Sequence, residues 1–141
     1  MGHLYHLGES MFFHIQLIDD LSRPEKRQES RTDHWQYFDG HKNNFVARGA
    51  TTNDAGDQFL SSVLFVEFDN WDEVQKFIDE EPHNKNGVYS AVFIRRWHKA
   101  LDRLQIEFPR TEGQVSWYIR GYGKAGMHEK RQELLDVHRA Y

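Results

Sequence analysis

The sequence contains no cysteine, which excludes disulfide bonds and metal sites built on thiolates. It also lacks a run of about 20 apolar residues, the length that a membrane-spanning helix requires. Nor is there an excess of basic charge: the 141 residues carry a formal net charge of −4, which argues against general binding to nucleic acid. The first ten residues, MGHLYHLGES, are too polar for the core of a signal peptide. We therefore expect a cytoplasmic protein that has neither nucleic acid nor a membrane as its partner.

Segments typical of strands and helices follow one another between residues 11 and 101. Short, mostly apolar runs predict strands, and runs with helical spacing of apolar residues predict helices. The strands are expected over 11–18, 44–52, 58–68 and 88–97, and the helices over 25–38 and 71–80. The order β-α-β-β-α-β predicts a ferredoxin-like α+β fold with an antiparallel sheet and both helices on one face. We expect a second copy of the chain, or its C-terminal segment, to cover the other face.

The helix expected over 25–38 has an unusual polar face. Arg27, Arg31 and His34 follow one another at helical spacing, and Trp35 and Phe38 mark the same side as buried. Buried cations are costly unless an acid or an anionic ligand pairs with them. This face is therefore a candidate wall of a polar site. The alternative is an ion network that joins the helix to a loop without forming a pocket.

The C-terminal segment resembles the beginning of the chain. When residues 11–37 are set over 115–141 without a gap, eight of twenty-seven positions are identical, including the block EKRQE. We interpret this match as a partial duplication, with a strand over 115–120 and a helix over 127–141. The expected organisation is a leader or cloning remnant over 1–10, a ferredoxin-like domain over 11–101, a connection over 102–114 and a β-α arm over 115–141 that repeats the first β-α unit.

The loop of this arm, Gly121-Tyr122-Gly123-Lys124-Ala125-Gly126, has the spacing GxGxxG found in dinucleotide sites. A dinucleotide site also needs a second parallel strand and an acidic residue about 20 residues further on, and neither follows the motif. Several histidines lack the close spacing of metal ligands. They are His14, His41, His98 and His128. We therefore expect no cofactor and no bound metal.

Several short motifs in the first domain resemble the YciI-like (YCII-related) family, part of the dimeric α/β-barrel superfamily. Each motif is short, but all occur in order and at suitable spacing. The motifs are Lys26-Arg27 with Arg31 and His34, then Arg48-Gly49-Ala50, Val66-Glu67-Phe68, and Glu81-Pro82 followed by Gly87-Val88-Tyr89. The resemblance implies a homodimer and acid–base chemistry through a histidine and an aspartate. One member of the family is a dehydrochlorinase that acts on a chlorinated hydroxyquinol.

Carried over by position, His34 matches the family histidine, and Arg27 and Arg31 match the basic residues before it. Glu81 stands in place of the family aspartate, and the longer side chain can move the carboxylate by about 1 Å. His83 stands where the family often has an aromatic residue. The resemblance therefore implies that His34 and Glu81 are catalytic and that Arg27 and Arg31 bind substrate.

The residues are suited to this chemistry, because histidine is the natural proton shuttle at neutral pH. Our hypothesis is an enzyme that uses His34 and Glu81 on a small anionic or aromatic compound with hydroxyl or chloro substituents. One alternative is a module that binds a small ligand without turnover, and another is a dimerisation domain. The distance between His34 and Glu81, and the presence of a cavity beside them, distinguish these functions.

Overall fold

The computed structural model describes residues 10–141 and divides the chain into two compact units, Met1–Thr111 and Glu112–Tyr141. The leader expected over residues 1–10 lies outside the described residues, except for Ser10. The division falls within the stretch 102–114 that the sequence marks as a connection. Each unit is described separately below.

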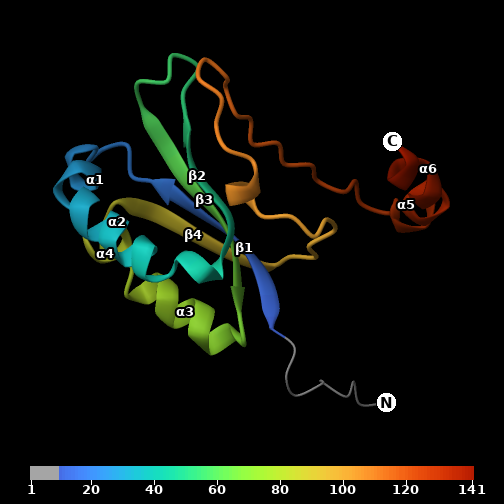
Figure 1. Cartoon of the computed structure of the whole chain (residues 1–141), viewed down its shortest axis with the longest axis horizontal. Coiled ribbons are helices and arrows are strands. Elements are labelled where there is room, and N and C mark those ends of the chain that lie inside the picture. Colours follow the sequence, from blue (N-terminus) through green and yellow to red (C-terminus); the bar gives the residue numbers. More distant parts are fainter. Residues whose placement is uncertain (1–9) are drawn as a thin grey trace. The chain divides into compact units, whose positions relative to one another are not determined.

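The first unit is built on a four-stranded sheet with the order β2-β3-β1-β4, in which all neighbouring strands are antiparallel (Figure 1). The strands are β1 (Met11–Asp19), β2 (Phe45–Thr52), β3 (Phe59–Phe68) and β4 (Tyr89–Arg96). Each begins and ends within one residue of its expected bounds. Strand order and direction confirm the ferredoxin-like α+β fold.

The core lies between the helices and one face of this sheet. Alternate residues of a strand face the same side, and Phe13, Ile15 and Leu17 of the central β1 are fully buried there. Helix α3 (Trp71–Asp79) packs against them with a conventional apolar side that includes Phe77. The side chain of Asn70 caps this helix by accepting the backbone N–H of Glu73 at 2.9 Å.

The first helix is not continuous. It consists of α1 (Glu25–Glu29) and α2 (Arg31–Gly40), separated at Ser30, where φ is −100° and ψ is 8°. The prediction of one helix over 25–38 is therefore wrong at this residue. Ser30 is buried, and its hydroxyl lies 3.0 Å from the carbonyl oxygen of Lys26, a local bond that competes with regular helix geometry.

Two short helical segments occur where loops are expected. Helix α4 (Pro82–Lys85) follows α3, and the 3-10 helix η1 (Lys42–Asn44) precedes β2. Proline suits the first position of α4, because its missing N–H is not needed there. Helix α4 fixes the backbone around Glu81, which is its N-cap residue.

The chain after β4 folds back over the sheet face opposite the helices. The ring of Trp97 packs against Phe12 and Phe65 on that face. Its centroid lies 6.2 Å from that of Phe12 and 4.8 Å from that of Phe65. Further on, the 3-10 helix η2 (Gln105–Glu107) lies beside β2, where the side-chain oxygen of Gln105 accepts the backbone N–H of Arg48 at 2.9 Å. Part of this face is therefore covered by the residues that follow β4 in the same chain.

The second unit does not form the expected β-α arm. Residues 115–120 have irregular backbone, and the helix expected over 127–141 consists of α5 (His128–Glu133) and α6 (Leu135–Ala140). A strand needs a hydrogen-bonded neighbour, whereas Val115, Trp117 and Ile119 are 72%, 82% and 88% exposed. The strand predicted over 115–120 is therefore wrong, and the duplication stays a prediction.

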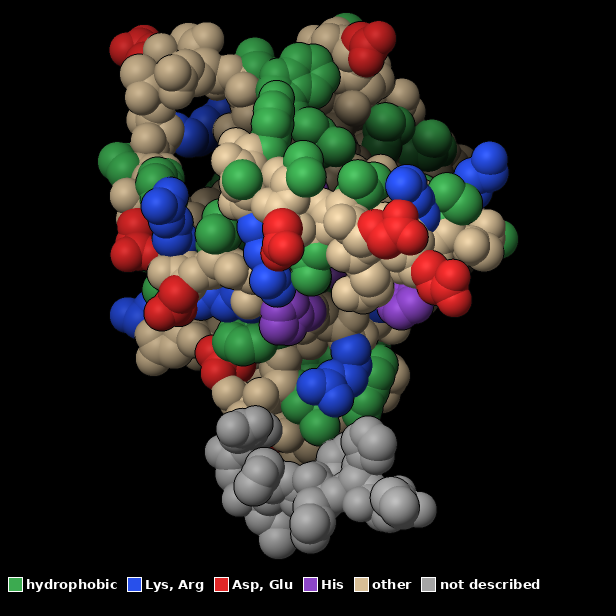
Figure 2. Space-filling model, turned by 90° about the vertical axis from the view of Figure 1, so that its right-hand side faces the viewer, with side chains coloured by type: hydrophobic (Ala, Val, Ile, Leu, Met, Phe, Trp, Pro, Cys, Tyr) green, Lys and Arg blue, Asp and Glu red, His purple; other side chains and the backbone are tan. Residues whose placement is uncertain are grey.

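Hydrophobic side chains are exposed on the molecular surface among acidic and basic ones (Figure 2). Despite them, the helices of residues 10–141 are all too short or too polar to cross a membrane.

Candidate functional site

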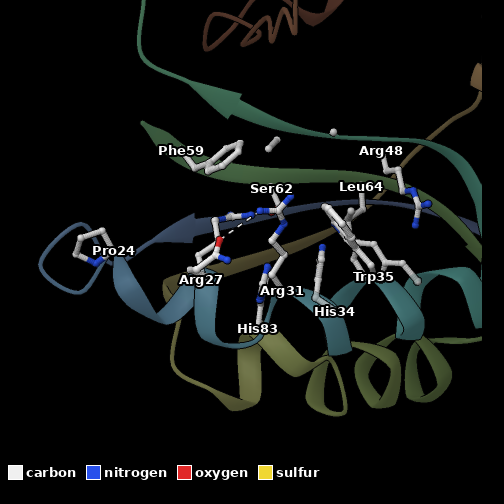
Figure 3. Close-up of a pocket in the computed structure, with 14 residues that line it drawn as sticks. Pro24, Arg27, Arg31, His34, Trp35, Arg48, Phe59, Ser62, Leu64 and His83 are labelled. Atoms are coloured by element: carbon white, nitrogen blue, oxygen red, sulfur yellow. Dashed lines mark hydrogen bonds between the residues drawn. The ribbon is translucent and has the colours of Figure 1, made fainter. Parts of the chain in front are cut away.

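A cavity of about 520 Å³ lies between helices α1 and α2 and the part of the sheet formed by β2 and β3 (Figure 3). This volume is typical of small-molecule sites. Arg31 and His34 extend from the helices toward the strands in Figure 3. The lining residues are Pro24, Arg27, Gln28, Arg31, His34, Trp35, Phe38, Arg48, Gly49, Ala50, Phe59, Ser62, Leu64 and His83. None of these described lining residues is acidic, and three are arginines, so the cavity suits an anionic ligand.

His34 and Glu81 form a buried pair at the base of the cavity. Nδ1 of His34 lies 2.6 Å from Oε1 of Glu81. Glu81 is fully buried and is the N-cap residue of α4, so its carboxylate also accepts the backbone N–H groups of His83 at 3.0 Å and Asn84 at 2.9 Å. Burial raises the pKa of Glu81, but these hydrogen bonds outweigh burial and leave the pKa below its ordinary value. Glu81 is therefore ionised at neutral pH.

The partners of His34 fix where its proton lies. An ionised carboxylate only accepts hydrogen bonds, so Nδ1 of His34 donates to Glu81. In the neutral ring Nε2 then carries no proton and can accept one. His34 is 7% exposed, and its ring points from α2 into the cavity (Figure 3). The pair has the arrangement of a general base whose tautomer is set by a carboxylate.

His83 is a second imidazole beside this pair. Its ring is stacked on that of His34, with centroids 3.9 Å apart and an angle of 9° between the ring planes. Nδ1 of His83 lies 2.7 Å from the hydroxyl of Ser30, the residue that separates α1 from α2. Burial, together with the charges of His34 and Arg27, lowers the pKa of His83 to about 4, although the charge of Glu81 opposes this shift. His83 is therefore neutral at physiological pH.

Arg27 lines the cavity but already has an acidic partner. Its Nε and Nη2 donate to the two carboxylate oxygens of Asp19 at 2.7 and 2.6 Å, and Nη2 also donates to the hydroxyl of Ser62 at 3.0 Å. Burial favours loss of its proton, but the bonds to Asp19 outweigh burial and hold the pKa of Arg27 above its ordinary value. Its charge is therefore balanced within the protein, and Arg27 shapes the cavity wall.

Arg31 lies at the rim of the cavity and is exposed. It donates to the side-chain oxygen of Gln28 at 3.3 Å, and its guanidinium lies 4.4 Å from the ring centroid of Trp35. The expectation that Trp35 is buried is wrong, because its side chain is 55% exposed and lines the cavity. The pair offers a flat aromatic surface with a cation beside it.

Arg48 approaches the cavity from the opposite wall, strand β2. Its guanidinium lies 4.8 Å from the ring centroid of Phe45 and 5.3 Å from that of Phe38. Its acidic partner, Asp39, is 3.6 Å away, and the Asp39 side chain is 75% exposed. Solvent weakens such a pair, so Arg48 keeps charge available for a ligand.

One group of potential metal ligands occurs among the described residues. His34, Glu81 and His83 each offer a ligand atom, and these atoms lie within 4.8 Å of one another. A metal binds imidazole nitrogen in the plane of the ring, and planes that are nearly parallel and 3.9 Å apart do not converge on one ion. Holding a metal here requires one ring to turn and Glu81 to give up hydrogen bonds.

Sequence reasoning identified part of this site. Helical spacing singles out Arg27, Arg31 and His34, and all three line the cavity. Glu81 also had a local signal that the sequence analysis did not use, because an acidic residue before proline is a common helix start. No sequence signal pointed to Ser30, Ser62 or the partner of Arg27, Asp19, and none gave His83 or Arg48 a role in a site. Their contacts join residues far apart in the chain.

Fold and site together define a class: a ferredoxin-like α+β domain with a histidine–carboxylate pair in a cavity between its first helices and the sheet. The chain belongs to the YCII-related domain family, whose model matches residues 11–98, as the resemblance predicted. No curated protein matches the chain significantly.

Solved structures that are similar to this chain include the following two. The 5-chloro-2-hydroxyhydroquinone dehydrochlorinase of Burkholderia phenoliruptrix AC1100, in complex with 2,5-dihydroxybenzoquinone, is 27% identical with a TM-score of 0.58. The similarity covers 62% of this chain and 94% of that chain. A dimeric ferredoxin-like protein of unknown function from Thermobifida fusca YX is 16% identical with a TM-score of 0.41, over 69% of this chain and 97% of that chain.

Proposed function

We propose that the protein is an acid–base enzyme of the dehydrochlorinase type, which acts on a small aromatic compound with hydroxyl and chloro substituents. The observation that carries this proposal is the buried contact of 2.6 Å between His34 and Glu81 beside a cavity of small-molecule size. Similarity to a dehydrochlorinase supports the class of reaction. His34 and Glu81 are the catalytic residues, and Arg27 and Arg31 belong to the substrate-binding wall.

The proposed reaction is the loss of HCl from a chlorinated hydroxyquinol. A hydroxyl proton first moves to the ring carbon that bears chlorine. Chloride then leaves with the electron pair of its bond to carbon, while a second hydroxyl gives up its proton. The organic product is a hydroxyquinone, and the release of chlorine as chloride balances the oxidation of the ring. The group that accepts and returns the proton is Nε2 of His34.

The charges around the cavity support these steps. Glu81 stabilises the imidazolium that forms when His34 takes a proton. Removing a hydroxyl proton from the substrate leaves negative charge on oxygen, and Arg31 and Arg48 can stabilise this charge from opposite walls. Trp35 and Phe59 offer aromatic surface for the substrate ring.

The test is chloride release from 5-chloro-2-hydroxyhydroquinone. We expect release by the wild-type protein and a large loss in Glu81→Gln, which keeps the shape of the side chain but removes its charge. Glu133→Gln is the matched control, because Glu133 is exposed in the second unit. Absence of chloride release by the wild-type protein contradicts the proposal.

The alternative function is small-ligand binding without turnover. The observation that favours this alternative is the position of Glu81 as the N-cap of α4, which already gives the carboxylate a structural purpose. Calorimetry with 2,5-dihydroxybenzoquinone distinguishes the two functions. Binding together with chloride release supports the enzyme, whereas binding without chloride release supports the binding module.

We also propose that the protein forms a homodimer through the sheet face opposite the helices. On this face Phe93 of β4 is 43% exposed, even though residues after β4 cover Phe12 and Phe65. An apolar face of this kind favours association with a second copy. Sedimentation at micromolar concentration tests the proposal, with Phe93→Lys expected to give monomers.

A further inference from the structure

The base of the cavity contains two imidazole rings, and the proposed reaction uses only one of them. His83 is 1% exposed and lines the cavity next to His34. Its backbone N–H donates to the same carboxylate oxygen of Glu81 that His34 contacts, so backbone and ring together fix its position. A buried polar ring held in this way needs a hydrogen-bond partner for each nitrogen.

The partners of Ser30 indicate which nitrogen of His83 carries the proton. The Ser30 hydroxyl lies 3.0 Å from the carbonyl oxygen of Lys26 and 2.7 Å from Nδ1 of His83. The hydroxyl has one proton, and a carbonyl oxygen can only accept. Both contacts are hydrogen bonds only if Ser30 donates to Lys26 and accepts from Nδ1 of His83. The neutral His83 ring then has no proton on Nε2.

The same accounting applies to His34, whose Nδ1 donates to Glu81 and whose Nε2 has no proton. Each ring is thus anchored to the protein through a protonated Nδ1. The two rings are parallel, and Figure 3 shows both of them beneath the cavity with a nitrogen at the end nearer the strands. The cavity therefore has two neighbouring hydrogen-bond acceptors at its base.

We propose that His83 contacts the ligand directly, with Nε2 accepting a hydrogen bond from a ligand hydroxyl next to the group that reacts with His34. The ligand class is an aromatic ring with two adjacent hydroxyl groups. The centroid separation of 3.9 Å lets two neighbouring donors each reach one ring, since such bonds are about 2.7–3.0 Å long. The inference rests on the proposed function in two respects, because it takes the cavity as the ligand site and His34 as the residue that reacts with the ligand.

The first experiment needs no ligand. Nitrogen chemical shifts from ¹⁵N-labelled histidine report which ring nitrogen carries a proton. At pH 7 we expect His83 to be neutral, with its proton on Nδ1, and Ser30→Ala to shift the proton population toward Nε2. A wild-type His83 with its proton on Nε2 overturns the proposal.

The second experiment compares catechol, which has two adjacent hydroxyl groups, with 2-methoxyphenol, in which one hydroxyl is methylated. We expect wild-type protein to bind catechol about 3- to 10-fold more tightly, the effect of one neutral hydrogen bond. His83→Phe keeps an aromatic ring against His34 but has no acceptor, so this preference should disappear. The exposed His138→Phe is the control and should keep the preference.

Failure of the inference is distinguishable from failure of the proposed function. Equal binding of the two compounds by wild-type protein, or no binding of either, contradicts the role of His83. A preference that survives in His83→Phe contradicts it as well. The proposed function is judged separately by chloride release. Should His83→Phe fail to fold, Ser30→Ala replaces it, because a proton on Nε2 also removes the acceptor and the preference with it.

Discussion

Two helical segments of this chain share the sequence EKRQE but have different surroundings. In the first unit, Lys26 and Glu29 form an ion pair of 3.2 Å, and in the second Lys130 and Glu133 form one of 2.9 Å. Both helices are interrupted at the residue after this block, Ser30 in one and Leu134 in the other. Local sequence therefore produces the same local structure twice.

The two segments differ in their contacts with residues that are distant in the sequence. His34 is 7% exposed and contacts Glu81, whereas His138, at the matching position, is exposed. Arg27 pairs with Asp19, whereas Arg131 has Gly123 at the position that matches Asp19. The comparison teaches that the helical segment alone does not form the candidate site. The sheet and α4 supply the residues that bury its side chains and pair with them.

The largest expected effect is a difference in turnover between variants of the two matching histidines, His34 and His138. His34→Ala is expected to reduce the turnover number for chloride release by about 10²- to 10⁴-fold, because this variant lacks the proposed general base. His138→Ala should leave turnover unchanged, since its side chain is solvated in the second unit. Steady-state kinetics with 5-chloro-2-hydroxyhydroquinone measure both variants. Equal losses in the two variants would contradict the proposal that the contact with Glu81 makes His34 the catalytic histidine.

The next effect concerns the two matching arginines. Arg27→Ala leaves the buried carboxylate of Asp19 without its partner, and we expect a loss of about 3–5 kcal/mol in the free energy of unfolding. Arg131→Ala removes an exposed side chain and should change this free energy by no more than about 0.5 kcal/mol. Urea denaturation measures both. A loss in Arg27→Ala as small as in Arg131→Ala would show that solvent reaches Asp19.

A smaller effect depends on pH and on the burial of His83. The pKa of this ring falls from its ordinary 6.5 to about 4 in the folded protein, so between these values the unfolded chain binds a proton that the folded chain does not. The free energy of unfolding therefore decreases as pH falls from 6.5 toward 4, and the His83 contribution to this decrease reaches about 3 kcal/mol. Urea denaturation across this range should show a shallower decrease in His83→Phe than in wild type. In His138→Phe the decrease should match wild type.

The fold could be predicted from sequence because its signals are local. Strand β1 shows its buried side as Phe13, Ile15 and Leu17, and Asn70 marks the beginning of α3. The same reasoning failed for residues 115–120, because β propensity describes suitability for a sheet and cannot supply a neighbouring strand. A strand forms only when a second segment pairs with it, and a local sequence pattern does not show whether such a segment is present.

The candidate site was predictable only in part for the same reason. Spacing along one helix places Arg27, Arg31 and His34 on one side, but it cannot distinguish a core from the rim of a cavity, which is why Trp35 was misjudged. The contact between Ser30 and His83 joins residues 53 positions apart in the sequence. The spacing of residue types along the sequence does not predict such a contact. It does not predict the interruption of the helix at Ser30 either.

The smallest expected effect compares the two residues at which the helices are interrupted, Ser30 and Leu134. Ser30→Ala removes the hydroxyl that accepts from Nδ1 of His83, leaves this nitrogen of a buried ring without its partner, and should lower the free energy of unfolding by about 1–3 kcal/mol. Leu134→Ala truncates a side chain that is 48% exposed and should cost no more than about 0.5 kcal/mol. If the interruption existed only for helix geometry, both alanines would have similar effects on stability, since both residues directly follow the block EKRQE. A larger cost at Ser30, abolished in a His83→Phe background, would assign the energy to the hydrogen bond and identify the interruption in the first helix as part of the site.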